Sequence, residues 1–488
     1  MCIERQHIRT SLEIQKVKFI QQSDERSEVD LDDEPDLLAG QKPIESDDTI
    51  KERPGLRESI RAVFSWRNYS VYLSTAWTFS AFSYLGLFFN LYFLELYPGG
   101  YLLLGAVLSL TSLVASISRL GGGYVGDVVN RKHLSVVAMF MMAIYNLILG
   151  ISIEFTWILI ALMFLSTMEI FKGGSSAFIM DNIPKEHSGL GLSLFQIGRV
   201  LGIFTLAAFV ILTPILGFGQ SLRLMFLIGG LFLIITSIAR AILLKGKAPE
   251  LKRESISLPR AFYQDNKRAV SLLLKMVPGL LAVVVIDSVS DALFRFGSYI
   301  YIYEEVGIEI PGIIIMSIVT IVISVPLLLG AGRLSDRYDV KKLALIVYSV
   351  VPISAILLFV SPMFPYWAPI SIINGAESMM EGLGAIFSTP FLAIVMKSVN
   401  DTLWLLLLLI IIKKNLPRQD TSKILSVFWF IIWMCASIGP YLGGFFFQYF
   451  YSGDLFLVIL VLNILLLGWI SKQGLITEHI TAETVNNG

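Results

Sequence analysis

Two related stretches decide how this chain folds: Gly123-Tyr124-Val125-Gly126-Asp127-Val128-Val129-Asn130-Arg131-Lys132 and Gly332-Arg333-Leu334-Ser335-Asp336-Arg337-Tyr338-Asp339-Val340-Lys341-Lys342. Each contains a glycine, three further residues, an aspartate and a short basic cluster, and each lies between two apolar segments. The glycine and the aspartate both recur after 209 residues, since 332 − 123 and 336 − 127 give the same value. A charged turn repeated at this distance predicts that the chain consists of two halves built alike.

The composition is that of an integral membrane protein. Of the 488 residues, 55% are hydrophobic and 16% are charged, and the mean hydropathy is +0.71. A soluble protein of this length is less apolar and more charged. The net charge is zero, and nothing in the sequence indicates nucleic-acid binding. Cys2 and Cys435 form neither a disulfide framework nor a metal-ligand pattern, so we predict no metal and no cofactor.

Apolar segments long enough to cross a bilayer, which takes about 20 residues, follow one another along the chain. We place six spans in the first half, at residues 70–94, 101–121, 134–153, 157–181, 191–213 and 222–244. Six more follow in the second half, at 277–301, 311–331, 343–361, 391–413, 424–449 and 454–471. The predicted fold is therefore an all-α integral membrane protein with 12 transmembrane helices in two pseudo-symmetric six-helix bundles.

Charges between the spans predict the orientation. Basic residues outnumber acidic ones between Lys245 and Lys275, and loops of this kind stay in the cytoplasm. Because the number of spans is even, both termini are predicted to be cytoplasmic, in a multi-pass protein of the cell membrane. The predicted parts are an acidic, disordered tail (1–66), the first bundle (67–246), a linker (247–268), the second bundle (269–472) and a tail (473–488). Extra residues near 362–390 are expected to form an outer-side excursion, a re-entrant segment or extensions of two helices.

The two repeated stretches resemble the signature loop of the major facilitator superfamily, which lies between helices 2 and 3 and again between helices 8 and 9. The first copy has Val128 and Asn130 where a basic residue and a glycine are usual. The resemblance implies alternating access by rocking of the two bundles around a central cavity, with solute bound near mid-membrane. It also implies a gating role, closing the cytoplasmic side, for Gly123, Asp127, Arg131, Lys132, Gly332, Asp336 and Arg337.

Charged residues inside predicted spans are the candidates for solute binding and coupling, because a charge at the bilayer centre costs about 2.5–3.5 kcal/mol. Asp287, Asp291 and Arg295 recur every four residues and therefore share one helical face. This acidic stripe has a surplus negative charge, which a purely structural role does not explain easily. The full set of candidates is Glu169, Lys172, Arg199, Asp287, Asp291, Arg295, Lys397 and Asp401.

The other candidates have structural interpretations as well. Glu169 and Lys172, three residues apart, form either part of the solute site or an ion pair that locks one helix against another. Arg199 is close enough to the cytoplasmic end to extend into water or to bind the signature loop. Lys397 and Asp401 have the same four-residue spacing as the acidic stripe, but their depth is harder to place beside the extra segment.

A small-residue motif in the eleventh span, Gly439-Pro440-Tyr441-Leu442-Gly443-Gly444, predicts close helix packing and a hinge. Exporters of the superfamily have a similar motif in the fifth span, where this chain lacks the proline. We therefore assign Gly439, Pro440, Gly443 and Gly444 to packing and do not infer antiport from them.

The predicted function is secondary active transport of a small polar or charged metabolite, with a proton carried by Asp287 or Asp291 and tuned by Arg295. Sodium is the alternative coupling ion, because paired carboxylates also bind hard cations. No catalytic constellation and no nucleotide-binding loop occurs, so we predict neither an enzyme nor an ATP-driven pump. The alternatives are a drug or metabolite exporter of the same fold and a membrane receptor or scaffold that does not transport. The predicted partners are the solute, protons and the lipid bilayer, for a protein that acts as a monomer.

Overall fold

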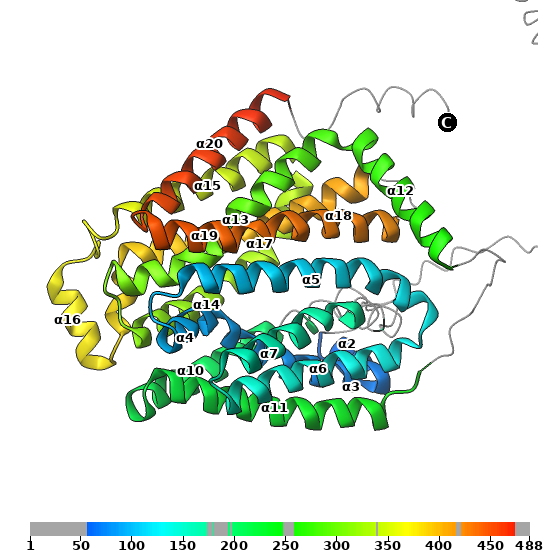
Figure 1. Ribbon diagram of the computed structural model, residues 1–488, viewed down its shortest axis with the longest axis horizontal. Coiled ribbons are helices and arrows are strands. Elements are labelled where there is room, and N and C mark those ends of the chain that lie inside the picture. The colour runs from blue at the N-terminus through cyan, green and yellow to red at the C-terminus, as the bar shows by residue number, and fades with distance from the viewer. Residues whose placement is uncertain are drawn as a thin grey trace, which may run out of the picture. The chain divides into compact units, whose positions relative to one another are not determined.

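The computed structural model describes residues 56–172, 178, 194–195, 198–246, 258–337, 340–415 and 421–473. These ranges are helical and contain no strand (Figure 1). The first half comprises α2 (Leu56–Ser65), α3 (Arg67–Ser83), η1 (Tyr84–Phe88), α4 (Phe89–Leu96), α5 (Tyr101–Val128), α6 (Arg131–Ile151), α7 (Phe155–Thr167), η3 (Gly198–Leu201), α10 (Gly202–Leu216) and α11 (Phe218–Leu243). After α12 (Leu258–Met276), the second half comprises α13 (Pro278–Glu304), α14 (Ile310–Arg337), α15 (Val340–Val360), α16 (Ile370–Met379), η4 (Leu383–Phe387), α17 (Thr389–Asn415), α18 (Thr421–Ala436), α19 (Ile438–Tyr449) and α20 (Asp454–Gln473).

Helices occupy the described part of every predicted span, which confirms the all-α class. By length and composition, eight described helices are able to cross a bilayer, and the bent pair α12–α13 brings this to nine if it is one span. The α10 helix and residues 310–324 of α14 are apolar but shorter. The count of twelve spans therefore stays a prediction, as do the domain boundaries and the orientation of the termini.

One face of α11 shows why the chain needs a bilayer. Four of its large exposed side chains, Leu231, Ile235, Ile238 and Ile242, recur at intervals of three or four residues. A stripe of this kind lies on one side of a helix, and water would not stabilise it. In a membrane protein the same stripe is the surface in contact with lipid.

The buried face of α11 carries a cation that the sequence analysis did not single out. Arg240 is 3% exposed, and its Nε donates a hydrogen bond to Thr75 Oγ1 of α3 at 2.7 Å. Its Nη1 donates to Ser135 Oγ of α6 at 2.7 Å, and the guanidinium lies 4.3 Å from the ring centre of Tyr72. Three helices of the first half are thus tied together by one side chain.

The two halves contact each other where α5 lies beside α18 and α19 (Figure 1). Small residues allow this approach, because a Cβ atom at Gly105 would collide with the backbone oxygen of Pro440. A Cβ atom at Gly444 would collide in the same way with the backbone oxygen of Tyr101. Two helix backbones therefore meet here without intervening side chains.

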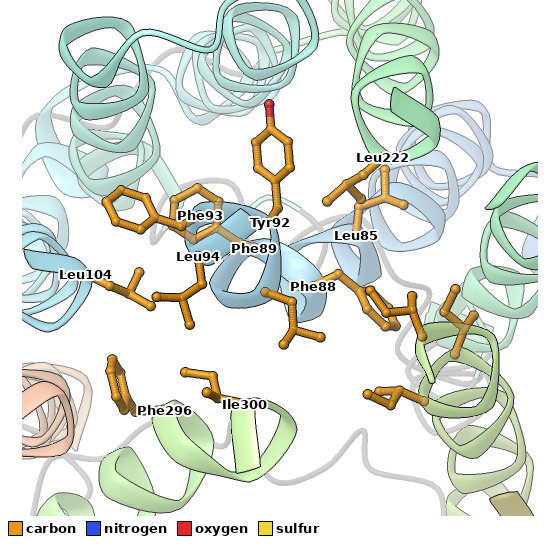
Figure 2. Packing of buried hydrophobic residues seen from close by; sticks show 14 of the residues in the cluster. Leu85, Phe88, Phe89, Tyr92, Phe93, Leu94, Leu104, Leu222, Phe296 and Ile300 are labelled. Atoms are coloured by element: carbon orange, nitrogen blue, oxygen red, sulfur yellow. The ribbon is translucent and has the colours of Figure 1, made fainter. Parts of the chain in front are cut away.

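A buried apolar cluster joins the halves next to this contact. Figure 2 shows Phe88 and Leu94 of the first span on the side of η1 and α4 that faces Phe296 and Ile300 of α13. The side chain of Asn90 donates a hydrogen bond to the backbone oxygen of Phe296 at 3.2 Å. The cluster fixes α13, which carries the acidic stripe, against the first half.

The extra residues near 362–390 form α16 and η4 in place of a spanning helix. The ten residues of α16 are too few to cross a bilayer. Thr389 N donates to Pro365 O at 2.9 Å and closes the base of the segment. Both carboxylate oxygens of Glu377 accept backbone hydrogen bonds, from Gly382 at 2.7 Å and Gly384 at 3.0 Å. The segment is thus not a spanning helix by itself, it packs on α14 where Gly382 approaches Gly312, and its predicted location on the outer side remains a prediction.

Candidate functional site

Four side chains of the second half form a closed cycle of alternating charges, here called the four-charge ring. Lys397 Nζ lies 2.6 Å from Asp291 Oδ1 and also contacts Asp401. Arg295 Nε lies 2.9 Å from Asp291 Oδ2, and Arg295 Nη2 lies 3.8 Å from Asp401 Oδ2. Four-residue spacing within α13 and within α17 puts each acid beside a base of its own helix. Two acids and two bases therefore neutralise one another.

The four-charge ring lies near the middle of its two helices and close to a contact with the first half. At ~1.5 Å per residue, Asp291 lies about 20 Å along α13 and Asp401 about 18 Å along α17. One turn beyond Arg295 on the same stripe, the ring of Tyr299 stacks on Phe88 of the first half, with 6.2 Å between ring centres. The side chain of Arg295 is nevertheless 60% exposed. The exposed side chain of Arg295 therefore lies one helical turn from a contact between the halves.

Asp287, one turn before the four-charge ring, has a different environment. Its Oδ1 accepts a hydrogen bond from the hydroxyl of Tyr348 in α15 at 2.7 Å, and its Oδ2 accepts one from Trp404 Nε1 in α17 at 2.8 Å. In the described part of the chain, no cation lies within ion-pair distance of this carboxylate. Two uncharged donors therefore hold Asp287, whereas two cations hold Asp291.

The first half has its own charged group, here called the Arg119 cluster and made of Arg119, Glu169 and Lys172. Arg119 Nε of α5 donates to Glu169 Oε2 at 2.7 Å, and Lys172 Nζ donates to Glu169 Oε1 at 3.0 Å. The guanidinium carbon of Arg119 lies 4.0 Å from the ring centre of Trp433 in α18. Because Trp433 belongs to the second half, the Arg119 cluster also lies where the halves meet.

The structure thus sorts the predicted site residues into three groups. Asp291, Arg295, Lys397 and Asp401 form the four-charge ring, Glu169 and Lys172 belong to the Arg119 cluster, and Asp287 stands apart. The side chain of Arg199 lies outside the described residues, although its backbone belongs to η3. The functional roles of all eight remain predictions.

Most of the predicted gating residues cannot be placed in the same detail. Gly123, Asp127, Gly332, Asp336 and Arg337 lie in the last turns of α5 and α14, and their side chains are outside the described residues. The side chains of Arg131 and Lys132, the other two predicted gating residues, are described.

Arg131 and Lys132 begin α6, and the side chain of Asn130 caps this helix by accepting a hydrogen bond from Lys132 N at 3.0 Å. Asparagine at the position where the signature loop usually has glycine thus has a local structural reason. The gating role itself stays a prediction.

The glycines of the eleventh span face two directions. A Cβ atom at Gly439 would collide with Ala292 of α13, and one at Gly443 would lie about 2.5 Å from the ring of Phe296. Gly444 instead faces α5 of the other half. Ser437 separates α18 from α19 just before the motif. These contacts are those of a packing motif, and movement at this point remains an expectation.

Three residues of the site were not found from the sequence alone. Arg119 stands two residues before the end of the predicted span 101–121. A basic residue at this position is usually interpreted as marking the end of the span. Tyr348 and Trp404 occur in apolar segments in which aromatic residues are ordinary core residues. The available signal for Trp404 was its spacing, because it lies three residues after Asp401 and seven after Lys397.

A family comparison decides what kind of protein has this arrangement. Residues 70–403, more than half of the chain, match the model of the Major Facilitator Superfamily. The chain belongs to this superfamily. None of the curated protein sequences compared with this superfamily member is similar to it.

Solved structures of transporters have the same fold as this superfamily member. A POT family transporter in complex with 5-aminolevulinic acid has a TM-score of 0.62 at 12% identity, covering 84% of this chain and 96% of that one. A mutant of the nucleoside transporter NupG has a TM-score of 0.59 at 11% identity, covering 83% and 99%. A D-xylose-proton symporter has a TM-score of 0.55 at 13% identity, covering 86% and 99%. At such identities the likeness concerns the fold alone.

Proposed function

We propose that this protein is a secondary active transporter that moves a small polar or charged metabolite by alternating access, driven by a proton gradient. The observation that carries the proposal is the contrast between the neutral four-charge ring and Asp287, a carboxylate beside it with uncharged donors only. Membership of the superfamily supports transport, and one similar fold is that of a symporter named for its proton. Charged residues inside membrane-spanning helices usually have a function.

Asp287 is the better proton carrier of the two acids predicted. Protonation of Asp291 would leave Lys397 and Arg295 with only Asp401 as an acidic partner, which leaves one buried cation uncompensated. Protonation of Asp287 breaks no ion pair. A carrier must gain and lose its proton in each cycle, so the group whose neighbours tolerate both states suits the role.

The hydrogen bonds also indicate which oxygen takes the proton. An indole N–H only donates, so Asp287 Oδ2 must accept from Trp404 in both protonation states. A tyrosine hydroxyl both donates and accepts, so Tyr348 can donate to the ionised Oδ1 and accept from the protonated one. The proton is therefore assigned to Oδ1, and Tyr348 reverses its hydrogen bond when Asp287 is loaded.

Transport by purified protein in proteoliposomes tests the proposal. A thermal-shift screen against amino acids, sugars, organic acids and cations first identifies a ligand, because binding to the folded state alone raises its apparent stability. Under an imposed pH gradient, the unchanged protein should accumulate that ligand with or without Na⁺. Asp287→Asn should lose accumulation and keep exchange of labelled for unlabelled ligand. Glu309→Gln, which removes an exposed acid in a loop, should behave as the unchanged protein.

The same assay separates the alternatives. If accumulation requires Na⁺ and does not depend on the pH gradient, the coupling ion is sodium and not the proton. If Asp287→Asn accumulates ligand normally and Asp291→Asn does not, Asp291 is the proton carrier. Binding of a ligand without exchange or accumulation of any kind would favour a receptor or scaffold over a transporter.

A further inference from the structure

The guanidinium of Arg119 has most of its hydrogen-bonding capacity unused. Of its five N–H donors, the described contacts use the one on Nε, which binds Glu169 Oε2 at 2.7 Å. Within the described part of the chain, no hydrogen bond donated by Nη1 or Nη2 is present. The guanidinium carbon lies 4.0 Å from the ring centre of Trp433 and the side chain is 23% exposed, so the group is partly accessible while its Nη donors are unused.

The charge of the Arg119 cluster is unbalanced. Arg119 and Lys172 together carry two positive charges, and Glu169 compensates one of them. The four-charge ring of the other half has no such surplus, since its two acids face its two bases. Within the set formed by the Arg119 cluster, the four-charge ring and Asp287, the unmatched charges are therefore one positive charge at the Arg119 cluster and, when it is ionised, Asp287.

We propose that the transported solute is an organic monoanion, whose carboxylate binds to the Nη edge of Arg119 and to Lys172, and that it crosses together with the proton of Asp287. This inference rests on the proposed function and names its substrate class. A carboxylate suits the site because its two oxygens match the fork of a guanidinium, and because Lys172, 48% exposed, supplies a second cation. The apolar face of Trp433 closes one side of the site.

The same charges give a physical reason for coupling. With Asp287 ionised and no solute, the surplus positive charge and the carboxylate cancel. With proton and anion both bound, the anion cancels the surplus charge and Asp287 is neutral. Loading only one of the two leaves one uncompensated charge among these described groups, and charge is unfavourable inside a bilayer. The half-loaded carrier therefore reorients slowly, and movement of the monoanion with its proton transfers no net charge.

Matched ligands test the charge of the solute. Monocarboxylates such as propionate, lactate, pyruvate and benzoate would each be compared with the corresponding amide, using thermal shift and the change in tryptophan fluorescence of the full chain. At least one acid should bind tenfold or more tightly than its amide, and propylamine should not bind. An amide, an amine or alanine that binds as tightly as the best acid would overturn the proposal. The fluorescence change should be absent in Trp433→Phe.

Variants distinguish a binding role of the Arg119 cluster from a structural one. Arg119→Gln should weaken binding of the best acid at least tenfold, and Arg119→Lys should lie in between because it keeps the charge and loses the fork. Glu169→Gln removes the competing carboxylate, so it should tighten binding several-fold, whereas a structural ion pair predicts weaker binding. Arg223→Gln, at a cation that donates to the backbone oxygen of Ile151, is the control and should change nothing.

Transport measurements separate failure of this inference from failure of the proposed function. Accumulation of the best acid under a pH gradient should not respond to a potassium-diffusion potential of either sign. Accumulation that follows this potential would refute the charge balance while leaving proton-driven transport intact. An acid that binds and is never accumulated would refute transport while leaving the anion site intact. Gradient-driven uptake of a neutral or cationic solute alone would confirm transport and overturn the anion site.

Discussion

At the scale of the residue, Lys397 holds the four-charge ring together. Its side chain is 8% exposed, and its ammonium contacts both Asp291 and Asp401. Without it, two carboxylates would share Arg295, which is much more exposed. Two ionised acids close together with one base leave an uncompensated buried charge, which is the most unfavourable result of breaking a buried pair.

We therefore expect Lys397→Met to destabilise the folded protein by about 3–5 kcal/mol, the usual range for such a break. The double variant Lys397→Met/Asp401→Asn should recover part of this loss, because it removes the uncompensated charge as well. Thermal unfolding in detergent measures both. Lys172→Met, which removes a half-exposed lysine from its ion pair, is the control, and about 1 kcal/mol or less is expected. Equal destabilisation by the two lysine variants would contradict the role given to Lys397.

Single residues were predicted from the sequence where periodicity made them visible. The four-residue spacing of Asp287, Asp291 and Arg295 placed three charges on one face in advance. The split between Asp287 and Asp291 was not predictable, because it depends on which side chains of α15 and α17 approach each acid. Arg119 was missed for a related reason: near a span end, a cation that extends to water and one that pairs inside look alike in a sequence.

At the scale of the element, α5 is the helix whose packing controls contact between the halves. It carries Gly105, which meets the backbone of Pro440, and further along Gly121, whose Cβ position has no atom within 4 Å apart from its chain neighbours and the nearby backbone of its own helix. The two glycines occur in one helix. Replacing either with alanine should stabilise the helix itself by about 1 kcal/mol, because alanine has the higher helix propensity. Only at Gly105 does an added methyl group oppose the packing of α5 on α19.

We expect Gly105→Ala to separate α5 from α19 and to favour the form open to the predicted outer side. Gly121→Ala should leave the distribution unchanged or slightly raise stability. The reporter is Ser109→Cys in a Cys2→Ser/Cys435→Ser background, since Ser109 Oγ accepts from Tyr441 N across the halves at 2.8 Å. A membrane-impermeant maleimide added from outside should label this cysteine faster in Gly105→Ala alone. Equal labelling rates in the two glycine variants would show that this contact does not limit opening.

Helices were predictable from the sequence where a long apolar segment indicates them. They were not predictable where local hydrogen bonds determine the conformation of the segment. The predicted span 454–471 corresponds to α20 (Asp454–Gln473), because an uninterrupted apolar run has only one regular way to satisfy its backbone in lipid. For the segment containing α16, the sequence was compatible with three different conformations. The form of this segment depends on Glu377 capping two backbone N–H groups, a contact that no periodicity reveals.

At the scale of the whole molecule, the proposed alternating access is an equilibrium between a form closed on one side and a form closed on the other. In this structure the halves contact each other on the predicted outer side, among other places through the hydrogen bond from the Tyr101 hydroxyl to Glu304 Oε2 at 2.8 Å. The signature loops are expected to close the opposite side. Each contact stabilises one state and not the other, so its removal shifts the populations by its own free energy.

Tyr101→Phe should therefore favour the form open to the outer side. A hydrogen bond to a charged group contributes about 1.5–3 kcal/mol, and since about 1.4 kcal/mol is tenfold in an equilibrium constant, the shift should be tenfold or more. The matched control is Tyr97→Phe, which removes a hydrogen bond of 3.0 Å to Ile153 O within the first half. Labelling of the Ser109→Cys reporter should accelerate in Tyr101→Phe and stay unchanged in Tyr97→Phe.

Asp127→Asn should have the opposite effect, because it weakens closure on the predicted cytoplasmic side. Labelling of the outer reporter should slow, and transport should slow while ligand binding is largely kept. The combined variant Tyr101→Phe/Asp127→Asn then weakens both closed states, and its labelling rate should return toward that of the unchanged protein. Two independent defects would each lower transport and would not restore the labelling rate. Recovery of the labelling rate in the double variant would therefore show that the two contacts act on opposite sides of one equilibrium. An additive loss of transport without such recovery would show that they act independently.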